Sequence, residues 1–245
     1  MAKVPVALVQ FDAVPEAVEE NRDKMENLAE RAVQSGARWV VFHEGTVADY
    51  TPLLLDLAEP VPDGESTRRM CDVAARLNCT ISFGLSEVED GKYYIAQVFV
   101  GPQGFFYRYR KTWLCRREGD EGYRNEWARY DPGTGPELFE IDGVRATCFI
   151  CSDGAAPRCI ERARHLKPEV VFYPHNVRRG LRNIESRGKK AETIQAPMLV
   201  TNRVGRSWTD ECLGGCAFFS AKGALLAKSN QENREEILIH TLDLS

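Results

Sequence analysis

The sequence lacks the features of several large protein classes. Its apolar runs fall well short of the roughly 20 residues that a membrane-spanning helix needs. The formal net charge is −4, and no basic run is interleaved with aromatic residues, so nothing favours nucleic acid or an anionic membrane as a partner. The chain begins directly with a strand-like run and shows no signal-peptide pattern. We therefore expect a cytoplasmic protein without a membrane segment.

Internal repeats, low-complexity segments and an evident linker are also absent. With 245 residues, 43% of them hydrophobic, the chain can bury a sizeable core, and we predict one domain over residues 1–245. Histidine is scarce, and none of the four histidines has an evident orienting partner. A Cys-His-Asn triad stays open, but without support from the pattern.

Cysteine, in contrast, is plentiful. The eight cysteines lie at positions 71, 79, 115, 148, 151, 159, 212 and 216. In a chain of this length without a leader, we expect mostly free thiols. Cys148 and Cys151 have CxxC spacing, which could mark a redox pair, half of a metal site, or a strand that delivers one nucleophile.

Apolar periodicity predicts strands that come in adjacent pairs and are separated by helices. Strands are expected at 4–13, 39–45, 80–88, 93–100, 105–110, 137–141, 144–150, 170–174, 198–205, 214–220, 224–229 and 236–244, and helices at about 18–33, 63–78, 157–165 and 183–195. This pattern indicates layers of helix over mixed sheets. The polar, irregular stretch 112–134 is long for a loop in a compact domain and is expected to be functional or disordered.

The position of the two central cysteines favours the nucleophile. A redox pair normally lies at a helix N-terminus, whereas Cys148 and Cys151 end an apolar run and would point to opposite faces of a strand. A zinc site needs a second pair, but Cys212 and Cys216 have three residues between them and no histidine nearby. Cys151 is followed by Ser-Asp-Gly and then by Pro157 and a predicted helix, which forms a strand-turn-helix elbow.

Three segments resemble the signature segments of the nitrilase, or carbon-nitrogen hydrolase, superfamily. They are VVFHEGT (40–46), RYRKTWL (108–114) and CFICSD (148–153), and they present Glu44, Lys111 and Cys151 in that order. The similarity extends through 4–13, 21–42, 199–205 and 214–229, and so over nearly the whole chain.

This resemblance implies an αββα sandwich that often associates through helices beside the active site, so we expect a homo-oligomer, a dimer or larger. It implies Glu44 as general base, Lys111 as the cation near the tetrahedral intermediate and Cys151 as nucleophile. The backbone N–H of Ser152 would complete the oxyanion hole. No cofactor or metal is implied.

The family usually has a second glutamate in the site. Glu118, Glu121 and Glu126 are the candidates, and Glu126 is favoured because it precedes an aromatic residue and a Pro-Gly turn. Three positions depart from the family pattern: Trp113 stands where His is frequent, Arg158 where Glu commonly follows Pro, and Cys216 where Ser commonly follows Gly-Gly. Further candidate pocket residues, which could equally serve packing or lie on the surface, are Tyr50, Trp113, His175, Asn176 and Arg178.

The predicted function is hydrolysis of a non-peptide C–N bond in a small amide through an acyl-thioester on Cys151. Within the same family, N-carbamoyl and nitrile substrates are the alternatives, and nitriles rank lower because nitrilases tend to be longer chains. From other classes, an inactive interaction protein or a thiol-redox or zinc protein stays open. Selective alkylation of Cys151 would favour the nucleophile.

Overall fold

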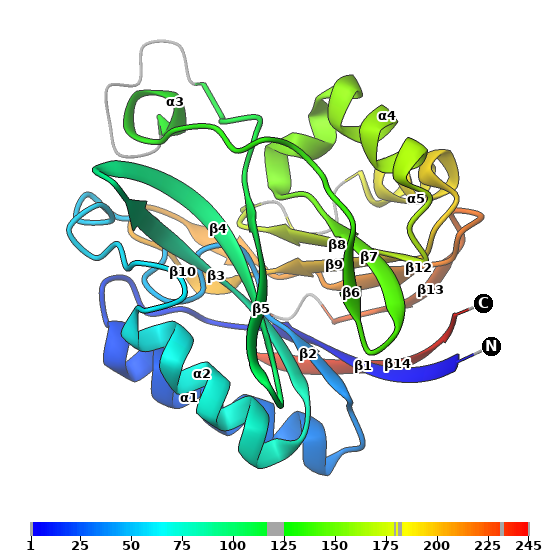
Figure 1. The fold of residues 1–245 in the computed structure, drawn as a ribbon, viewed down its shortest axis with the longest axis horizontal. Helices are drawn as coiled ribbons and strands as arrows, with labels where there is room; N and C mark the ends of the chain where they lie inside the picture. Colours follow the sequence, from blue (N-terminus) through cyan, green and yellow to red (C-terminus); the bar gives the residue numbers. More distant parts are fainter. Residues whose placement is uncertain (1, 117–124, 179, 181–182, 231–232, 245) are drawn as a thin grey trace.

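Two six-stranded sheets lie face to face in the computed structural model, which describes residues 2–116, 125–178, 180, 183–230 and 233–244. One helix pair, α1 and α2, covers the outer face of the first sheet, and a second pair, α4 and α5, covers the second sheet (Figure 1). This is the αββα layering that the family resemblance implies. The helices are α1 (Val18–Gln34), α2 (Glu65–Leu77), α3 (Glu126–Arg129), α4 (Pro157–Leu166) and α5 (Ile184–Ile194).

The first sheet has the order β14-β1-β2-β3-β4-β5. Its strands are β1 (Ala2–Gln10), β2 (Trp39–Val41), β3 (Thr80–Glu89), β4 (Lys92–Gly101), β5 (Gly104–Arg110) and β14 (Glu236–Leu244). β1, β2 and β3 are parallel, and α1 and α2 connect them. β3, β4 and β5 form an antiparallel meander, and β14 pairs antiparallel with β1.

The second sheet has the order β13-β12-β9-β8-β7-β6. Its strands are β6 (Phe139–Ile141), β7 (Val144–Cys148), β8 (Val170–His175), β9 (Met198–Asn202), β12 (Ala217–Phe219) and β13 (Leu225–Lys228). The parallel strands β7, β8 and β9 are connected by α4 and α5. A separate antiparallel pair, β10 (Val204–Arg206) and β11 (Glu211–Leu213), follows β9.

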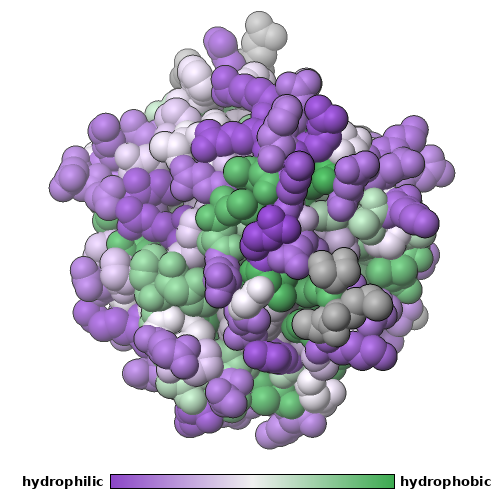
Figure 2. Space-filling model, turned by 45° about the vertical axis from the view of Figure 1, so that its right-hand side comes forward, coloured by the Kyte–Doolittle hydropathy of each residue, from purple (hydrophilic) through white to green (hydrophobic). Residues whose placement is uncertain are grey.

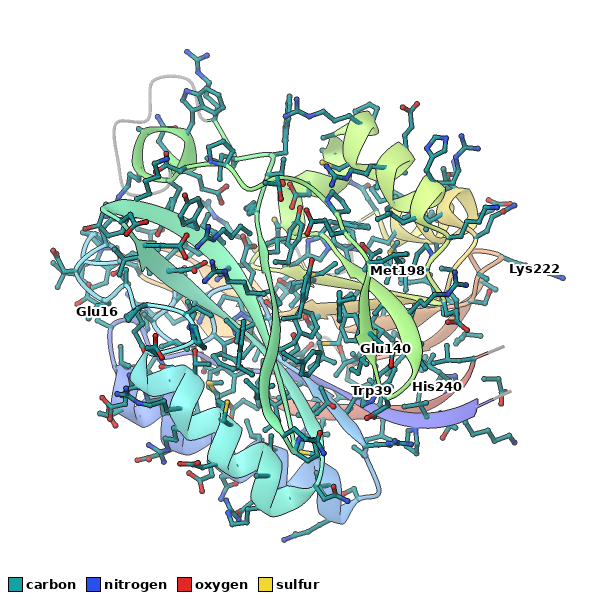
Figure 3. The ribbon with its side chains drawn as sticks, in the orientation of Figure 1. Glu16, Trp39, Glu140, Met198, Lys222 and His240 are labelled. Atoms are coloured by element: carbon teal, nitrogen blue, oxygen red, sulfur yellow. The ribbon has the colours of Figure 1, made fainter. Side chains whose placement is uncertain are left out.

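Aromatic rings fill the space between the sheets. Trp39 of β2 packs against Phe172 of β8 with ring centroids 6.0 Å apart, and Phe99 of β4 meets Phe172 edge-on at 5.1 Å. Figure 3 shows Trp39 inside the sandwich and Lys222 extending into solvent. The face in Figure 2 is mostly hydrophilic, with separate hydrophobic patches. Burial of these rings supplies the main driving force that holds the two sheets together.

Several predicted strands are shorter than the apolar runs that suggested them. β2 ends at Val41, four residues before the predicted end, and the chain turns at Gly45, whose backbone is left-handed (φ 71°). β7 ends at Cys148, two residues before the predicted end. The predicted strand 198–205 divides into β9 and β10, and within the irregular stretch 112–134 the described part contains the short helix α3.

Candidate active site

Three segments that follow strands converge at one edge of the sandwich. Glu44 lies in the turn after β2, Lys111 directly follows β5, and Cys151 begins the turn after β7. Glu44 and Lys111 are almost completely buried. The first two come from one sheet and the third from the other, so the site lies where the two sheets meet.

Lys111 binds two carboxylates. Its Nζ lies 2.7 Å from Glu44 Oε1 and 2.7 Å from Glu126 Oε1. Burial would lower the pKa of Lys111, but the Glu126 and Glu44 carboxylates outweigh it and raise that pKa well above its ordinary value. The ammonium therefore stays charged inside a buried site, where its field is weakly screened.

Glu126 is held at both oxygens. Its Oε2 accepts the Cys115 backbone N–H at 2.7 Å while its Oε1 contacts Lys111. Burial, with Glu44 as a further cause, raises the pKa of Glu126, while Lys111 opposes this shift. Of the three candidate glutamates, the structure brings Glu126 to Lys111, while Glu118 and Glu121 lie outside the described residues.

Glu44 reaches its position because β3 leaves room for the turn. A Cβ atom on Gly84 would lie 2.3 Å from the Gly45 backbone nitrogen, so only glycine fits there. The Val47 N–H then donates to the Gly84 carbonyl at 3.1 Å. In the site itself, the Tyr50 hydroxyl donates to Glu44 Oε1 at 2.7 Å.

Cys151 occupies a strained elbow. Its φ is 45°, in the left-handed region that side chains other than glycine seldom adopt. It begins a 3₁₀ turn (Cys151–Ala155) that leads into α4. Tyr173 donates its hydroxyl to the Cys151 carbonyl at 2.9 Å, and this approach requires Gly154, where a Cβ atom would overlap the Tyr173 hydroxyl. The strand-turn-helix elbow is therefore present.

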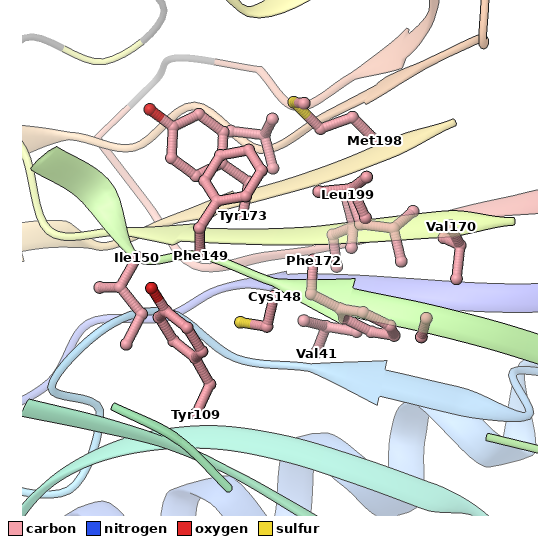
Figure 4. Packing of buried hydrophobic residues seen from close by; sticks show 14 of the residues in the cluster. Val41, Tyr109, Cys148, Phe149, Ile150, Val170, Phe172, Tyr173, Met198 and Leu199 are labelled. Atoms are coloured by element: carbon pink, nitrogen blue, oxygen red, sulfur yellow. The ribbon is translucent and has the colours of Figure 1, made fainter. Parts of the chain in front are cut away.

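Strand alternation does not separate the two central cysteines, contrary to the prediction. Cys151 lies beyond the end of β7, so it is the turn rather than the pleat that separates it from Cys148. Cys148 is fully buried in the core, and Figure 4 shows it among Tyr109, Phe172 and Val41. The two thiols are free, and they lie in different surroundings.

Burial raises the pKa of the Cys151 thiol, and the Glu44 carboxylate raises it further. The Lys111 ammonium and the Asn176 backbone N–H lower it. The balance keeps the resting side chain a thiol, so a base must take its proton during attack. Glu44 is the carboxylate that most strongly affects this thiol.

A cavity of about 470 Å³ opens at this edge. Its lining residues are Glu44, Asp49, Tyr50, Cys115, Glu126, Cys151, Ser152, Asn176, Val177, Arg178, Ser207 and Cys212. Lys111 is not itself in the lining and lies behind the two glutamates that it binds.

Three of the five predicted pocket residues line this cavity: Tyr50, Asn176 and Arg178; Ser152, predicted for the oxyanion hole, lines it as well. Arg178 forms an ion pair with Asp210 at 2.9 Å.

Trp113 and His175 do not line the cavity, contrary to the expectation. Trp113 is 46% exposed and lies under the Arg158 guanidinium, 4.9 Å from the ring centroid. His175 is buried against Tyr173, with ring centroids 4.0 Å apart. His175 is the last residue of β8, and the cavity is lined by Asn176, the residue that follows the strand.

Five further residues line the cavity that were not predicted from the sequence: Asp49, Cys115, Val177, Ser207 and Cys212. Ser207 and Cys212 come from the β10–β11 hairpin, whose return to the cavity has no local signal in the sequence.

Asp49 is another missed residue. It accepts from Asn176 Nδ2 at 2.9 Å and pairs at 2.9 Å with the fully buried Arg203. Asp49 directly precedes the predicted pocket residue Tyr50, and this position was the available sequence signal that Asp49 lies near the cavity.

Two observations concern metal sites and membrane-spanning helices. In the described part of the chain, no three His, Cys, Asp or Glu side chains are grouped as ligands for a metal ion. None of the described helices combines the length and apolar character that a membrane crossing needs.

Comparison with known proteins places the chain in a family. Residues 5–245 match the sequence model described as carbon-nitrogen hydrolase. A nitrilase from Pyrococcus abyssi is 27% identical over 258 aligned positions, covering 98% of this chain and 90% of the relative. An (R)-stereoselective amidase from Pseudomonas sp. is 24% identical, covering 78% of this chain and 67% of the relative.

The fold has solved counterparts. A carbon-nitrogen hydrolase superfamily protein from Xanthomonas campestris superposes with a TM-score of 0.87 at 20% identity, covering 99% of this chain and 91% of that protein. The predicted αββα fold of the nitrilase type is thereby confirmed. The chain belongs to the carbon-nitrogen hydrolase family, whose enzymes act on carbon-nitrogen bonds other than peptide bonds.

Proposed function

We propose that this enzyme hydrolyses small amides through an acyl-thioester on Cys151. One observation carries the proposal: Lys111 Nζ lies 2.7 Å from both Glu44 and Glu126 behind the wall of a cavity that also exposes Cys151. This arrangement provides a base, a cation and a nucleophile in one site.

The first half of the reaction forms the thioester. Glu44 takes the proton of the Cys151 thiol as the sulfur attacks the carbonyl carbon, and the carbonyl electrons move to oxygen. The Lys111 charge and the Ser152 backbone N–H stabilise this oxyanion. The carbonyl then re-forms, the C–N bond breaks, and the nitrogen leaves with the proton from Glu44.

The second half releases the acid. Water attacks the thioester carbon while Glu44 accepts its proton. The C–S bond breaks, the sulfur recovers a proton, and a carboxylic acid leaves. Glu44 thus acts as base and acid in turn, and Glu126 keeps Lys111 in place throughout.

A nitrile is the second candidate substrate, because a relative with coverage of 98% of this chain is named a nitrilase. That relative is covered over 90% of its own length, so it is not one of the longer nitrilases on which our lower ranking of nitriles rested. The amidase among the relatives supports amides.

A matched panel tests the proposal. The purified protein is incubated with propionamide, propionitrile and N-carbamoyl-β-alanine, and released ammonia and acid are measured. We expect turnover of the amide, and mass spectrometry should locate a propionyl group on Cys151. Turnover of the nitrile or the carbamoyl compound alone would reassign the substrate. No turnover in any arm, together with no selective alkylation of Cys151 by iodoacetamide, would contradict a thiol hydrolase.

A further inference from the structure

Asp153, two residues after the proposed nucleophile, is a buried carboxylate that the reaction above does not use. Its side chain is fully buried, and among the described residues no Lys or Arg lies within ion-pair distance of it. Burial raises its pKa, and hydrogen bonds to the carboxylate oppose that shift together with the more distant Lys111 charge. A buried carboxylate without a cation in contact is costly, so the hydrogen bonds that it accepts must offset the cost.

Four donors meet at this carboxylate. Oδ1 accepts the backbone N–H groups of Thr112 at 3.0 Å and Trp113 at 2.5 Å. Oδ2 accepts the Ile150 backbone N–H at 2.9 Å and the Tyr109 hydroxyl at 2.8 Å. Three of the four donors belong to the segment that carries Lys111, and the fourth belongs to the residue before Cys151.

The contact with Ile150 is reciprocal. The Asp153 backbone N–H donates to the Ile150 carbonyl at 2.9 Å, while the Asp153 side chain accepts from the Ile150 N–H. These two bonds close a small ring around Cys151 and Ser152. They hold Cys151 at its strained φ of 45°.

Two further contacts join the same pair of segments. Ser152 Oγ donates to the Trp113 carbonyl at 2.5 Å. The Arg158 guanidinium lies over the Trp113 ring. The chain after β5 is therefore attached to the elbow after β7 at several points. Among Asp153, Ser152 and Arg158, it is Asp153 whose side chain binds both the chain around Lys111 and the residue before Cys151.

We propose that Asp153 is a positioning residue that fixes the distance between the Cys151 sulfur and Lys111 by binding the backbones on either side of both. This inference rests on the proposed function of the site. It assigns the exposed Trp113 a role as well: its backbone, rather than its ring, serves the site. A displacement of about 1 Å between reacting groups can lower turnover by about a hundredfold.

Asp153→Asn tests the proposal. The two side chains have the same shape, but the amide NH₂ of Asn would face a backbone N–H in place of an acceptor, whichever way it is turned. We expect kcat for propionamide, per folded molecule, to fall by about a hundredfold. KM should change less than threefold, and the pH midpoints of kcat/KM should stay at their wild-type values.

Glu59→Gln is the matched control. Glu59 also accepts a backbone N–H, from Ser66 at 2.7 Å, and contacts Arg22, but it lies beside α2 and away from the cavity. This variant should lose stability and keep its kcat. A purely structural role for Asp153 predicts the same behaviour for both variants.

Tyr109→Phe covers the case in which Asp153→Asn does not fold. It removes one of the four donors and keeps the ring, so a folded protein with kcat lowered two- to tenfold and KM unchanged supports the proposal. An unchanged kcat in the variant or variants that fold overturns it. Activity that returns at a shifted pH also overturns it, because Asp153 would then act through its charge.

The wild-type protein separates this inference from the proposed function. Wild-type turnover of propionamide with an unaffected Asp153→Asn variant refutes only the positioning role. A wild-type protein that neither turns over the panel nor reacts selectively at Cys151 refutes the proposed function itself.

Discussion

At the scale of single residues, the two central cysteines differ in surroundings, although three positions separate them. Cys148 is fully buried in the core, whereas Cys151 lines the cavity. Cys151→Ala should abolish turnover, while Cys148→Ala should keep most of it and lower the free energy of unfolding by about 1 kcal/mol. Steady-state kinetics and urea denaturation check both variants. Equal losses of turnover in two folded variants would exclude a single nucleophile.

Glu126 is expected to support turnover through Lys111. Glu126→Gln keeps the shape of the side chain and can still accept the Cys115 N–H, but it removes the charge next to the ammonium. A lost charge-assisted hydrogen bond is worth about 1.5–3 kcal/mol, so kcat should fall roughly ten- to a hundredfold. Gln variants at 118 and 121, compared by activity and melting temperature, are the controls. Full activity of the Gln variant at 126, together with a loss of activity in the variant at 118 or 121, would show that Glu126 is not the second glutamate of the site.

Glu44 should have opposite effects on hydrolysis and on alkylation. Its charge helps to raise the pKa of the Cys151 thiol, second only to burial. Glu44→Gln should therefore abolish hydrolysis, because the base is gone, but lower the thiol pKa and speed alkylation by iodoacetamide at pH 8. Alkylation rates measured from pH 6 to 10 check this expectation. Slower alkylation than in the wild type, with the fold intact, would contradict it.

At the scale of elements, the segment after β2 couples the site to the stability of the fold. His43 is buried there, and its Nδ1 lies 2.7 Å from the Glu44 carbonyl. Burial, and next the Arg203 charge, lower the pKa of His43 to about 3. The pKa of His175 at the end of β8 is also lowered, with burial as the main cause.

The depressed pKa of His43 predicts acid sensitivity. The unfolded chain binds this proton near pH 6.5, so the stabilisation is fully present above pH 6.5 and is lost as the pH falls toward 3. Between pH 7.5 and pH 5, His43 alone should lower the free energy of unfolding by about 2 kcal/mol. Urea denaturation at the two pH values measures this. His43→Gln should reduce the difference in the free energy of unfolding between the two pH values. His165→Gln, at an exposed position, should leave this difference unchanged. Equal stability of the wild type at both pH values would refute the prediction.

The helix connections explain why the elbow is so well defined. Pro157 begins α4 two residues after the end of the 3₁₀ turn, and a proline at the first helical position has no N–H to satisfy. The turn is thereby held between β7 and α4, and Cys151 is displaced from the pleat of the strand.

At the scale of the whole molecule, we predict that copies of the chain associate through the surface of α4 and α5. The resemblance to the family implies association through helices beside the active site, and α4 begins two residues after the turn that carries Cys151. Light scattering across a dilution series should give a mass at least twice that of one chain. A mass of one chain at every concentration would rule this out.

The sequence by itself predicted the layers of the fold and indicated the residues that we propose as the reacting groups. Apolar periodicity is a local property, so it indicated most strands and helices, and the order of Glu44, Lys111 and Cys151 with their flanking segments identified the family. Glu126 was distinguished from its neighbours by a turn signal. Strand ends were less well predicted, because backbone hydrogen bonding and not hydrophobicity decides where β2 and β7 stop.

Only the tertiary structure decided which side chains surround the cavity. Ser207 and Cys212 reach it through the β10–β11 hairpin, and Trp113 turns away to the Arg158 guanidinium, although its neighbour Thr112 contacts Asp153. Asp153 lies two residues after Cys151, yet three of the donors to its carboxylate are about 40 residues distant in the chain. Such contacts depend on how two sheets approach each other, and that approach is a property of packing over the whole molecule rather than of any local stretch.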